Sequence, residues 1–228
     1  MPRGRAPLLI AIAIAFVVFI LAPTLAGFFV DLWWFREVGY DVVFVRTLVT
    51  RLLLFLAGAL LAGAMMYLNL TIALRGVAPE PMVVQAGDSV RTIDVGAVGL
   101  RMRRPIALLF AFFTGIGVSG TWSTVLQAIH GTSFAAQDPV FGRDIGWYVF
   151  TLPAISTLLA VLTSLVVFTL FVVVPTYFFR RDIIVLPNRL RIEPSAQLHL
   201  ATLLAAYFVL AALRLWLVDS AALLQSTT

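Results

Sequence analysis

The chain has 228 residues, of which 61% are hydrophobic and 12% are charged, and its mean hydropathy is +1.03. Soluble globular proteins are about 45–50% apolar and about 25% charged. This composition therefore excludes a soluble enzyme, a disordered tail and a coiled coil, and it indicates an integral membrane protein. There is no cysteine, which excludes disulfide scaffolds, thiolate metal sites and cysteine nucleophiles. In a membrane protein, a net charge of +5 is interpreted through the loops that hold the basic residues, and it does not indicate nucleic-acid binding.

Five stretches are long and apolar enough to cross a hydrocarbon core of about 30 Å, which takes about 20 residues of helix. Their length and the absence of apolar–polar alternation favour helices over barrel strands. The predicted fold class is all-α, a polytopic transmembrane helix bundle that forms a single membrane domain over residues 1–228. The five predicted spans are residues 8–30, 52–73, 105–129, 155–179 and 196–218.

The first stretch has a second interpretation, a cleaved signal peptide. Arg3 and Arg5 form a basic start, and Thr24-Leu25-Ala26 is a passable cleavage site. However, the apolar run continues beyond that site to Val30 and then meets the aromatic residues 33–35, which are typical of a membrane interface. We therefore expect a retained helix.

The positions of arginine predict the orientation, because cytoplasmic loops are enriched in basic residues. All 16 basic residues are arginines, and the acidic residues divide almost evenly between the two sides. We expect a cytoplasmic N-terminus and an extracytoplasmic C-terminus in a bacterial cytoplasmic membrane. The inside then holds Arg3, Arg5, Arg75, Arg91, Arg101, Arg103, Arg104, Arg180, Arg181, Arg189 and Arg191, and the outside holds Arg36, Arg46, Arg51, Arg143 and Arg214.

Aromatic residues agree with this orientation, because amphipathic rings prefer the depth of the lipid headgroups. We interpret them as membrane anchors rather than as ligand-binding groups. Those at predicted outer boundaries are Trp33, Trp34, Tyr40, Trp147, Tyr148 and Trp216, and those toward inner boundaries are Tyr67 and Tyr177.

One motif suggests an intramembrane hydrolase. Residues 117–120 read G-x-S-G, which resembles the nucleophile motif of rhomboid proteases, and His199 lies two helices later. At 1.5 Å per residue, Ser119 lies roughly 21 Å and His199 roughly 5 Å from the cytoplasmic ends of their helices, which separates them in depth by about 15 Å. His130 lies near the outer surface and is no better placed. We therefore interpret these small residues as a packing face, with the spaced pairs Gly115–Ser119, Gly58–Ala62 and Ala59–Gly63.

Ion-coupled carriers place ionisable groups near the bilayer midplane. No Asp, Glu, Arg or His lies at mid-depth in any of the five predicted spans. Asn69 is closer to the inner edge, and a neighbouring helix can satisfy its amide. Transport by this chain alone is therefore disfavoured, although lining a pore together with partner helices is not.

The remaining polar residues have several interpretations. The outer arginines Arg46, Arg51 and Arg214 could pair with nearby carboxylates, contact lipid phosphates or extend to the interface. The inner loop at residues 77–104 could lie on an anionic leaflet. The carboxylates in question are Asp31, Glu37, Asp41 and Asp219.

The outer loop at residues 130–153 contains His130, Asp138 and Asp144. These residues lack the spacing of a metal site. The chain also lacks a phosphate-cradling glycine-rich loop and a dinucleotide fingerprint. We predict no catalytic, cofactor-binding or metal-binding residue and no cofactor.

Two segments resemble a bacterial membrane family known as Uncharacterised Protein Family 0182. Residues 31–40 resemble its first outer loop, and residues 138–153 are similar to its second outer loop. The order of helices and loops fits along nearly the whole chain. The motif residues are Asp31, Trp33, Trp34, Phe35, Gly39, Tyr40, Asp138, Pro139, Phe141, Asp144, Tyr148, Phe150, Leu152 and Pro153.

The resemblance implies a multi-pass membrane protein without established activity, and it supplies no catalytic residues. Members of that family are several times longer, with a large extracytoplasmic region, so we expect either a fragment or a shortened relative. The leading hypothesis is a non-enzymatic membrane anchor or scaffold for an extracytoplasmic region. The alternative is a permease or channel component that acts with partner helices. Expected partners are the lipid bilayer and membrane proteins or a second copy of the chain, without nucleic acid.

Overall fold

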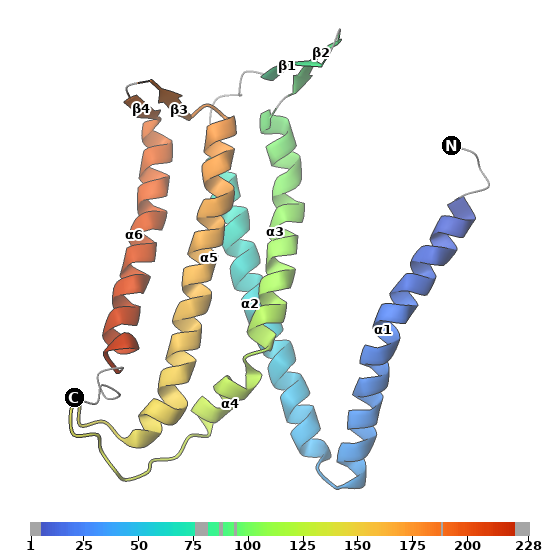
Figure 1. Cartoon of the computed structure of the whole chain (residues 1–228), viewed down its shortest axis with the longest axis vertical. Helices are drawn as coiled ribbons and strands as arrows, with labels where there is room; N and C mark the ends of the chain where they lie inside the picture. The colour runs from blue at the N-terminus through green and yellow to red at the C-terminus, as the bar shows by residue number, and fades with distance from the viewer. Residues whose placement is uncertain (1–5, 76–81, 87–88, 94, 188, 222–228) are drawn as a thin grey trace. The chain divides into compact units, whose positions relative to one another are not determined.

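The computed structural model describes residues 6–75, 82–86, 89–93, 95–187 and 189–221 (Figure 1). The described chain is mostly helical, with two short antiparallel hairpins. It divides into two compact units, residues 1–50 and residues 51–228, which are described separately. The helices are α1 (Ala6–Glu37), α2 (Asp41–Ala73), α3 (Val95–Ser119), α4 (Trp122–Ile129), α5 (Leu152–Phe179) and α6 (Pro194–Leu217), and a π-helical turn, η1 (Trp147–Thr151), precedes α5. The strands are β1 (Met82–Ala86), β2 (Ser89–Ile93), β3 (Ile183–Leu186) and β4 (Arg189–Ile192).

Five helices in the described residues are long and apolar enough to cross a membrane. Large apolar side chains point outward from them, among them Leu60 at 73% exposure and Phe171 at 79%. Such surfaces are unfavourable in water and suit contact with lipid. The five candidate spans are Ile14–Glu37, Asp41–Ala73, Ala97–Ser119, Trp147–Phe179 and Pro194–Ala221.

In the first unit, α1 and the start of α2 are joined by a tight turn. The Tyr40 amide donates to the Phe35 carbonyl (2.8 Å), and the Gly39 amide donates to the Arg36 carbonyl (3.2 Å). These two bonds define a Schellman motif, which requires a left-handed residue directly after the helix. Gly39 occupies that position with φ +75°. The segment that the sequence placed in an outer loop is therefore mostly helical, with a short turn at its centre.

In the second unit, α5 and α6 lie side by side and hairpin β3–β4 joins them (Figure 1). Val173 and Tyr177 of α5 pack against Ala196 of α6 and Ala73 of α2 in one buried cluster. A second buried cluster joins α2 to α3 through Met66, Leu70 and Ala107. The core is thus a series of helix contacts within an otherwise lipid-compatible surface.

Small residues bring α2 and α3 close together. A Cβ atom at Gly58 would lie 2.9 Å from the Val118 Cβ, and one at Gly63 would lie 3.1 Å from the Ala111 Cβ. At Gly115 it would lie 2.9 Å from the Phe55 backbone oxygen. The small-residue packing expected from the sequence is therefore present at these three glycines.

The third helix differs from its predicted bounds of residues 105–129. It begins ten residues earlier and ends at Ser119, and α4 follows as a separate helix after Gly120 and Thr121. The Ser119 and Thr121 hydroxyls donate to the carbonyls of Ile116 and Val118, each at 2.8 Å. Such back-bonding bends helices, and glycine weakens the helix at the same point.

The two hairpins were not predicted by the all-α interpretation. Strands β1 and β2 pair from Met82–Ile93 to Ala86–Ser89, within the expected inner loop. Strands β3 and β4 pair from Ile183–Ile192 to Leu186–Arg189, between α5 and α6. Both are local pairings of five or four residues per strand, so they carry little of the long-range apolar signal that identifies membrane spans.

Candidate functional site

A polar cluster of Asn69, Tyr177 and His199 joins α2, α5 and α6. Tyr177 Oη lies 2.8 Å from His199 Nδ1, and His199 Nε2 lies 2.8 Å from Asn69 Oδ1. Since an amide oxygen only accepts, Nε2 carries a proton, and in a neutral imidazole Nδ1 then accepts a hydrogen bond from the Tyr177 hydroxyl. Asn69 Nδ2 in turn donates to the Met65 carbonyl at 2.7 Å. The three side chains thus form one continuous chain of hydrogen bonds with the His199 imidazole at its centre.

The cluster is shielded by close packing. Tyr177 is 3% exposed, and its ring lies edge-on to the His199 ring with centroids 5.9 Å apart. Asn69 and His199 are partly buried. The expectation that a neighbouring helix would satisfy Asn69 is confirmed, and its partner is His199. Interhelical hydrogen bonds of this kind stabilise membrane bundles by about 0.6 kcal/mol on average, so the cluster is well suited to fixing the positions of three helices.

Arg180 adds a second link between α5 and α2 near this cluster. Its Nη1 donates to the backbone carbonyls of Ala73 and Arg75 (3.0 Å for the second), where α2 ends. A guanidinium is a favourable cap there, because the last carbonyls of a helix lack intrahelical donors. Arg180 Nε also lies 3.5 Å from Asp182 Oδ2. Burial raises the pKa of Asp182, Arg180 opposes that rise, and Glu193 adds to it.

The hydrolase pairing has no counterpart in this geometry. The Ser119 hydroxyl donates to the carbonyl of Ile116, its own helix neighbour. Both His199 ring nitrogens are occupied by Tyr177 and Asn69. The structure has a hollow beside β4 and an apolar groove between α3 and α5. Neither cavity is lined by Asn69, Tyr177 or His199.

At the other end of α5, Asp138 organises the loop that precedes the helix. Its Oδ1 accepts from the amides of Val140 (2.9 Å) and Phe141 (2.6 Å). Its Oδ2 accepts from the Arg143 amide (2.9 Å) and from the Tyr148 hydroxyl (2.8 Å). Burial raises the pKa of Asp138, but these four hydrogen bonds together outweigh it and lower the pKa to about 2. The carboxylate is therefore a buried, fully occupied acceptor.

Asp144 holds the adjacent part of the same loop. It accepts from the Ser133 hydroxyl (2.6 Å) and from the amides of Phe134 (3.2 Å) and Gly146 (2.7 Å). The Ser133 hydrogen bond lowers the pKa of Asp144, burial opposes it, and the backbone amides lower it further. Each aspartate thus accepts hydrogen bonds from backbone amides close to it in the chain, so each acts as a turn-forming residue. The amides are those of Phe134, Val140, Phe141, Arg143 and Gly146.

Aromatic side chains brace this loop against the start of α5. The Phe134 and Phe150 rings stack with centroids 6.0 Å apart and planes 9° apart. The Arg143 guanidinium lies 4.1 Å from the centroid of the Trp147 ring, a cation–π contact. Trp147 and Phe150 both belong to η1, and Leu152 and Pro153 open α5 directly after it. The motif from Asp138 to Pro153 is thus one structural unit.

Other predicted residues have separate positions. His130 Nδ1 lies 3.0 Å from the Leu126 carbonyl of its own helix. Among the described residues, no group of three or more His, Cys, Asp or Glu is arranged to hold a metal ion. Of the arginines predicted to lie outside, Arg214 pairs with Asp219 at 3.8 Å, which was one of the interpretations left open by the sequence. Arg51 instead lies 5.0 Å from the Trp122 ring centroid.

Sequence reasoning missed the Tyr177–His199 bond, the Arg180 cap and the role of Asp138. Tyr177 had been interpreted only as an interfacial ring, and Arg180 only as an orientation signal. The Asp-Pro and Phe-Gly pairs at residues 138–142 did indicate a turn. An aspartate followed within five residues by a glycine is the signal that could have identified Asp138 as a turn-forming acceptor.

Comparison with known proteins gives one family. The Uncharacterised protein family (UPF0182) matches residues 8–228. A UPF0182 protein of Rhodococcus jostii (strain RHA1) is 33% identical over 228 residues, covering 95% of this chain and 23% of that protein. One of Thermobifida fusca (strain YX) is 34% identical over 229 residues, covering 95% and 22%. The chain therefore spans 22–23% of the length of these curated relatives. No solved structure matches it.

Proposed function

The chain belongs to the uncharacterised protein family UPF0182, and we propose that it acts as a non-enzymatic membrane anchor or scaffold for an extracytoplasmic region. The proposal places it in a bacterial cytoplasmic membrane as a multi-pass protein with a cytoplasmic N-terminus. The bacterial relatives and the five candidate membrane helices support this placement. The distribution of arginine over the loops supports the orientation.

One observation carries the proposal: Asp138, Asp144 and His199, which could otherwise act as bases or metal ligands, are hydrogen-bonded to other groups of the same chain. Asp138 accepts four hydrogen bonds, Asp144 accepts three, and His199 makes two. A catalytic base or a metal ligand needs a lone pair that is free to meet substrate or metal. Groups arranged in this way stabilise a fixed set of helices and a fixed outer loop, which is what an anchor requires.

The orientation can be tested with single cysteines, because the chain has none of its own. Val140→Cys lies in the loop before α5 and Arg104→Cys lies in α3, and both native side chains are exposed. In intact cells, a membrane-impermeant maleimide should label only Val140→Cys. Arg104→Cys should react only after the membrane is permeabilised. The reverse pattern would refute the proposed orientation.

Scaffolding itself can be tested from the same position. A photo-reactive cross-linker on Val140→Cys should give one discrete protein adduct in native membranes, because a scaffold presents its outer loop to a fixed partner. The matched control is Leu108→Cys, which lies on the exposed flank of α3, where the native leucine is 70% exposed. A cross-linked product that is the same from both positions, or absent from Val140→Cys, would contradict a scaffold that binds through this loop.

A second candidate function is a permease or channel component that acts with partner helices. It is favoured by an apolar groove of about 490 Å³ between α3 and α5, lined by residues that include Phe110, Ser164 and Phe168. Such a groove can receive apolar side chains of another helix. Purified chain in liposomes should conduct ions and small solutes no faster than empty vesicles if it is only a scaffold. Flux above that background would favour the permease.

The absence of enzymatic activity is also part of the proposal. Ser119→Ala removes the hydroxyl of the candidate nucleophile, which in the native chain donates a hydrogen bond to the carbonyl of Ile116. The variant should keep the cross-linked partner and the growth phenotype of the native chain. Loss of a hydrolytic product in the Ser119→Ala strain, with the protein still folded, would overturn this part.

A further inference from the structure

The β3–β4 hairpin carries an apolar surface that the other described residues leave exposed. Val185 is 70% exposed and Leu190 is 59% exposed. The two residues face each other in the strand pairing, so they form a single apolar patch near the tip of the hairpin. The hairpin connects the end of α5 to the start of α6, two candidate membrane helices. Its place in the chain therefore puts this patch at a membrane surface.

The register of the strands gives the hairpin two distinct faces. Opposite residues of an antiparallel pair lie on the same face, and the face alternates at each step. Ile183 and Ile192 form one pair, and Val185 and Leu190 form the next pair on the same face. Ile183 and Ile192 pack against the buried cluster at the ends of the helices. The exposed pair thus continues the face by which the hairpin rests on the ends of the two candidate membrane helices.

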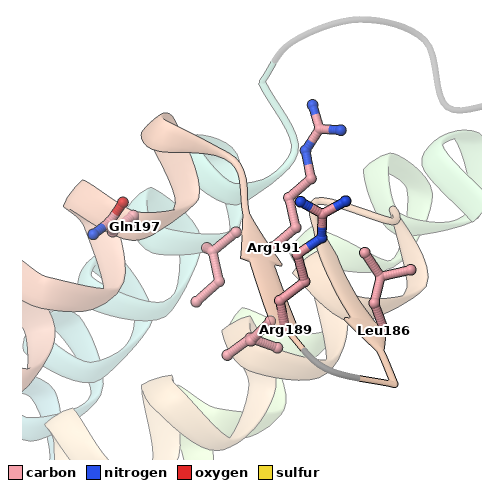
Figure 2. A pocket seen from close by; sticks show the side chains of 6 residues that line it. Leu186, Arg189, Arg191 and Gln197 are labelled. Atoms are coloured by element: carbon pink, nitrogen blue, oxygen red, sulfur yellow. The ribbon is translucent and has the colours of Figure 1, made fainter.

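The opposite face carries two arginines. Arg189 pairs with Leu186, and Arg191 pairs with Ile184, so both guanidinium groups lie on the face away from Val185 and Leu190. Figure 2 shows the two side chains extending in parallel from β4. Both are exposed, and among the described residues neither has a carboxylate partner. They border a hollow of about 520 Å³ that also includes Gln197 of α6.

We infer that the β3–β4 hairpin is an interfacial anchor that inserts Val185 and Leu190 into one leaflet and binds the phosphate groups of anionic phospholipids through Arg189 and Arg191. An apolar face that sinks about 5–10 Å into the headgroup region, with basic residues on the other face, is the arrangement of interfacial amphipathic helices. Here a hairpin provides the same two faces. Guanidinium groups suit phosphate because they can donate two parallel hydrogen bonds to it. The inference goes beyond the proposed scaffold and does not depend on it.

Charge complementarity distinguishes a lipid from other occupants of this surface. Two cations without a carboxylate partner among the described residues, on the face opposite an apolar pair, match the phosphates that lie above acyl chains. The connection to α5 and α6 brings such lipids within reach. Neighbouring Arg180 is already committed to the carbonyls of Ala73 and Arg75 and to Asp182. The lipid contacts are therefore assigned to the two arginines of β4.

Insertion can be tested with a polarity-sensitive fluorophore on Val185→Cys in the full chain. Proteoliposomes of phosphatidylcholine alone and of equal parts phosphatidylcholine and phosphatidylglycerol provide the two membranes. The fluorophore should shift to shorter wavelength and be quenched by lipids brominated on their acyl chains, more strongly with phosphatidylglycerol. A fluorophore that stays accessible to an aqueous quencher in both membranes would overturn the inference.

The role of the arginines can be tested by binding of fluorescent phosphatidylglycerol to the chain in neutral detergent. Each of Arg189→Gln and Arg191→Gln should weaken binding about fivefold, which corresponds to about 1 kcal/mol per basic residue near an anionic surface. The matched control is the double variant Arg101→Gln/Arg104→Gln, which removes two exposed arginines from α3. An equal loss of lipid binding in that control would overturn a lipid site on the hairpin. Displacement of the fluorescent lipid by inorganic phosphate as effectively as by unlabelled phosphatidylglycerol would overturn it too.

Discussion

Tyr177 and His199 are joined by a 2.8 Å hydrogen bond between Oη and Nδ1, although they belong to different candidate membrane helices. The segment between them folds back as the β3–β4 hairpin, so α6 begins beside the end of α5. The Glu193 amide closes this return by donating to the Asp182 carbonyl at 2.9 Å. A local hairpin and a long-range side-chain bond therefore set the same helix–helix contact.

This contact predicts a measurable coupling between the two side chains. Tyr177→Phe and His199→Leu should each lower the free energy of unfolding by about 1 kcal/mol, within the range for interhelical bonds in membranes. The double variant should cost less than the sum, because both changes remove the same bond. Thermal unfolding in one detergent would measure the stability of the two single variants and the double variant. Thr202→Val, which removes only a bond within α6, serves as the control, and additive losses would contradict the coupling.

Acid should open the loop before α5. The pKa of Asp138 falls from its ordinary 3.8 to about 2 in the folded protein, so the stability that Asp138 contributes is fully present above about pH 4 and is lost as the pH falls toward 2. Hydrogen exchange at the amides of Val140, Phe141 and Arg143 should accelerate over that window. Asp138→Asn should show the same fast exchange at neutral pH. Unchanged protection of the three amides in this variant would contradict the role of the carboxylate.

Gly39 should be sensitive to substitution because of its backbone conformation alone. Its φ is +75°, and no other group lies within 4 Å of where a Cβ would be placed. Gly39→Ala should destabilise the turn by about 1–2 kcal/mol, the cost of the left-handed region for an L-residue. Exchange of the Tyr40 amide reports on the bond that the turn closes. Gly27→Ala, also in open space but within α1, should be neutral or stabilising, and equal effects would argue against the turn.

Gly115 and Gly117 offer a matched pair on one helix. A Cβ at Gly115 would lie 2.9 Å from the Phe55 backbone oxygen and ring, whereas at Gly117 nothing lies within 4 Å. Gly115→Ala should therefore lower the melting temperature, because the Phe55 backbone cannot move aside easily. Gly117→Ala should leave it unchanged or raise it, since alanine has the higher helical propensity. Equal melting temperatures would show that α2 and α3 are not in close contact.

Removing the hydroxyl of Thr169 should stabilise the folded protein. The side chain is fully buried in α5, and its Oγ1 has no hydrogen-bond partner among the described residues. Thr169→Val keeps the shape and should raise the free energy of unfolding by about 1 kcal/mol, since an unsatisfied buried hydroxyl is costly. Thr176→Val is the control, because that hydroxyl donates to the Val172 carbonyl at 2.8 Å. A destabilised Thr169→Val would indicate a partner for this hydroxyl.

The helices could be predicted from the sequence because membrane spanning depends on apolar length, which is summed over many residues. The fourth and fifth predicted spans therefore lie within three residues of α5 and α6 at each end. The break after Ser119 was missed because it depends on the hydroxyls of Ser119 and Thr121, which act locally against a continuing apolar run. The hairpins were missed for a similar reason, because each strand is too short to carry a pattern.

The polar contacts were less predictable. Asn69 was expected to find a partner on a neighbouring helix, and it does so in His199, but 130 positions separate the two residues. No local spacing encodes such a pair. Asp138, in contrast, bonds to donors no more than ten positions away. A closer reading of the turn residues around it could have identified its role.

The link between Arg180 and the end of α2 also has a consequence for biosynthesis. The guanidinium that caps the Ala73 carbonyl is supplied 107 residues later in the chain. At about 5–20 residues per second, the ribosome needs on the order of 5–20 s to make that stretch. For this interval the nascent α2 lacks its cap, and the insertion machinery or the lipid headgroups must hold that end in place. The contact between Arg180 and the end of α2 can therefore form only after the fourth candidate span has been synthesised.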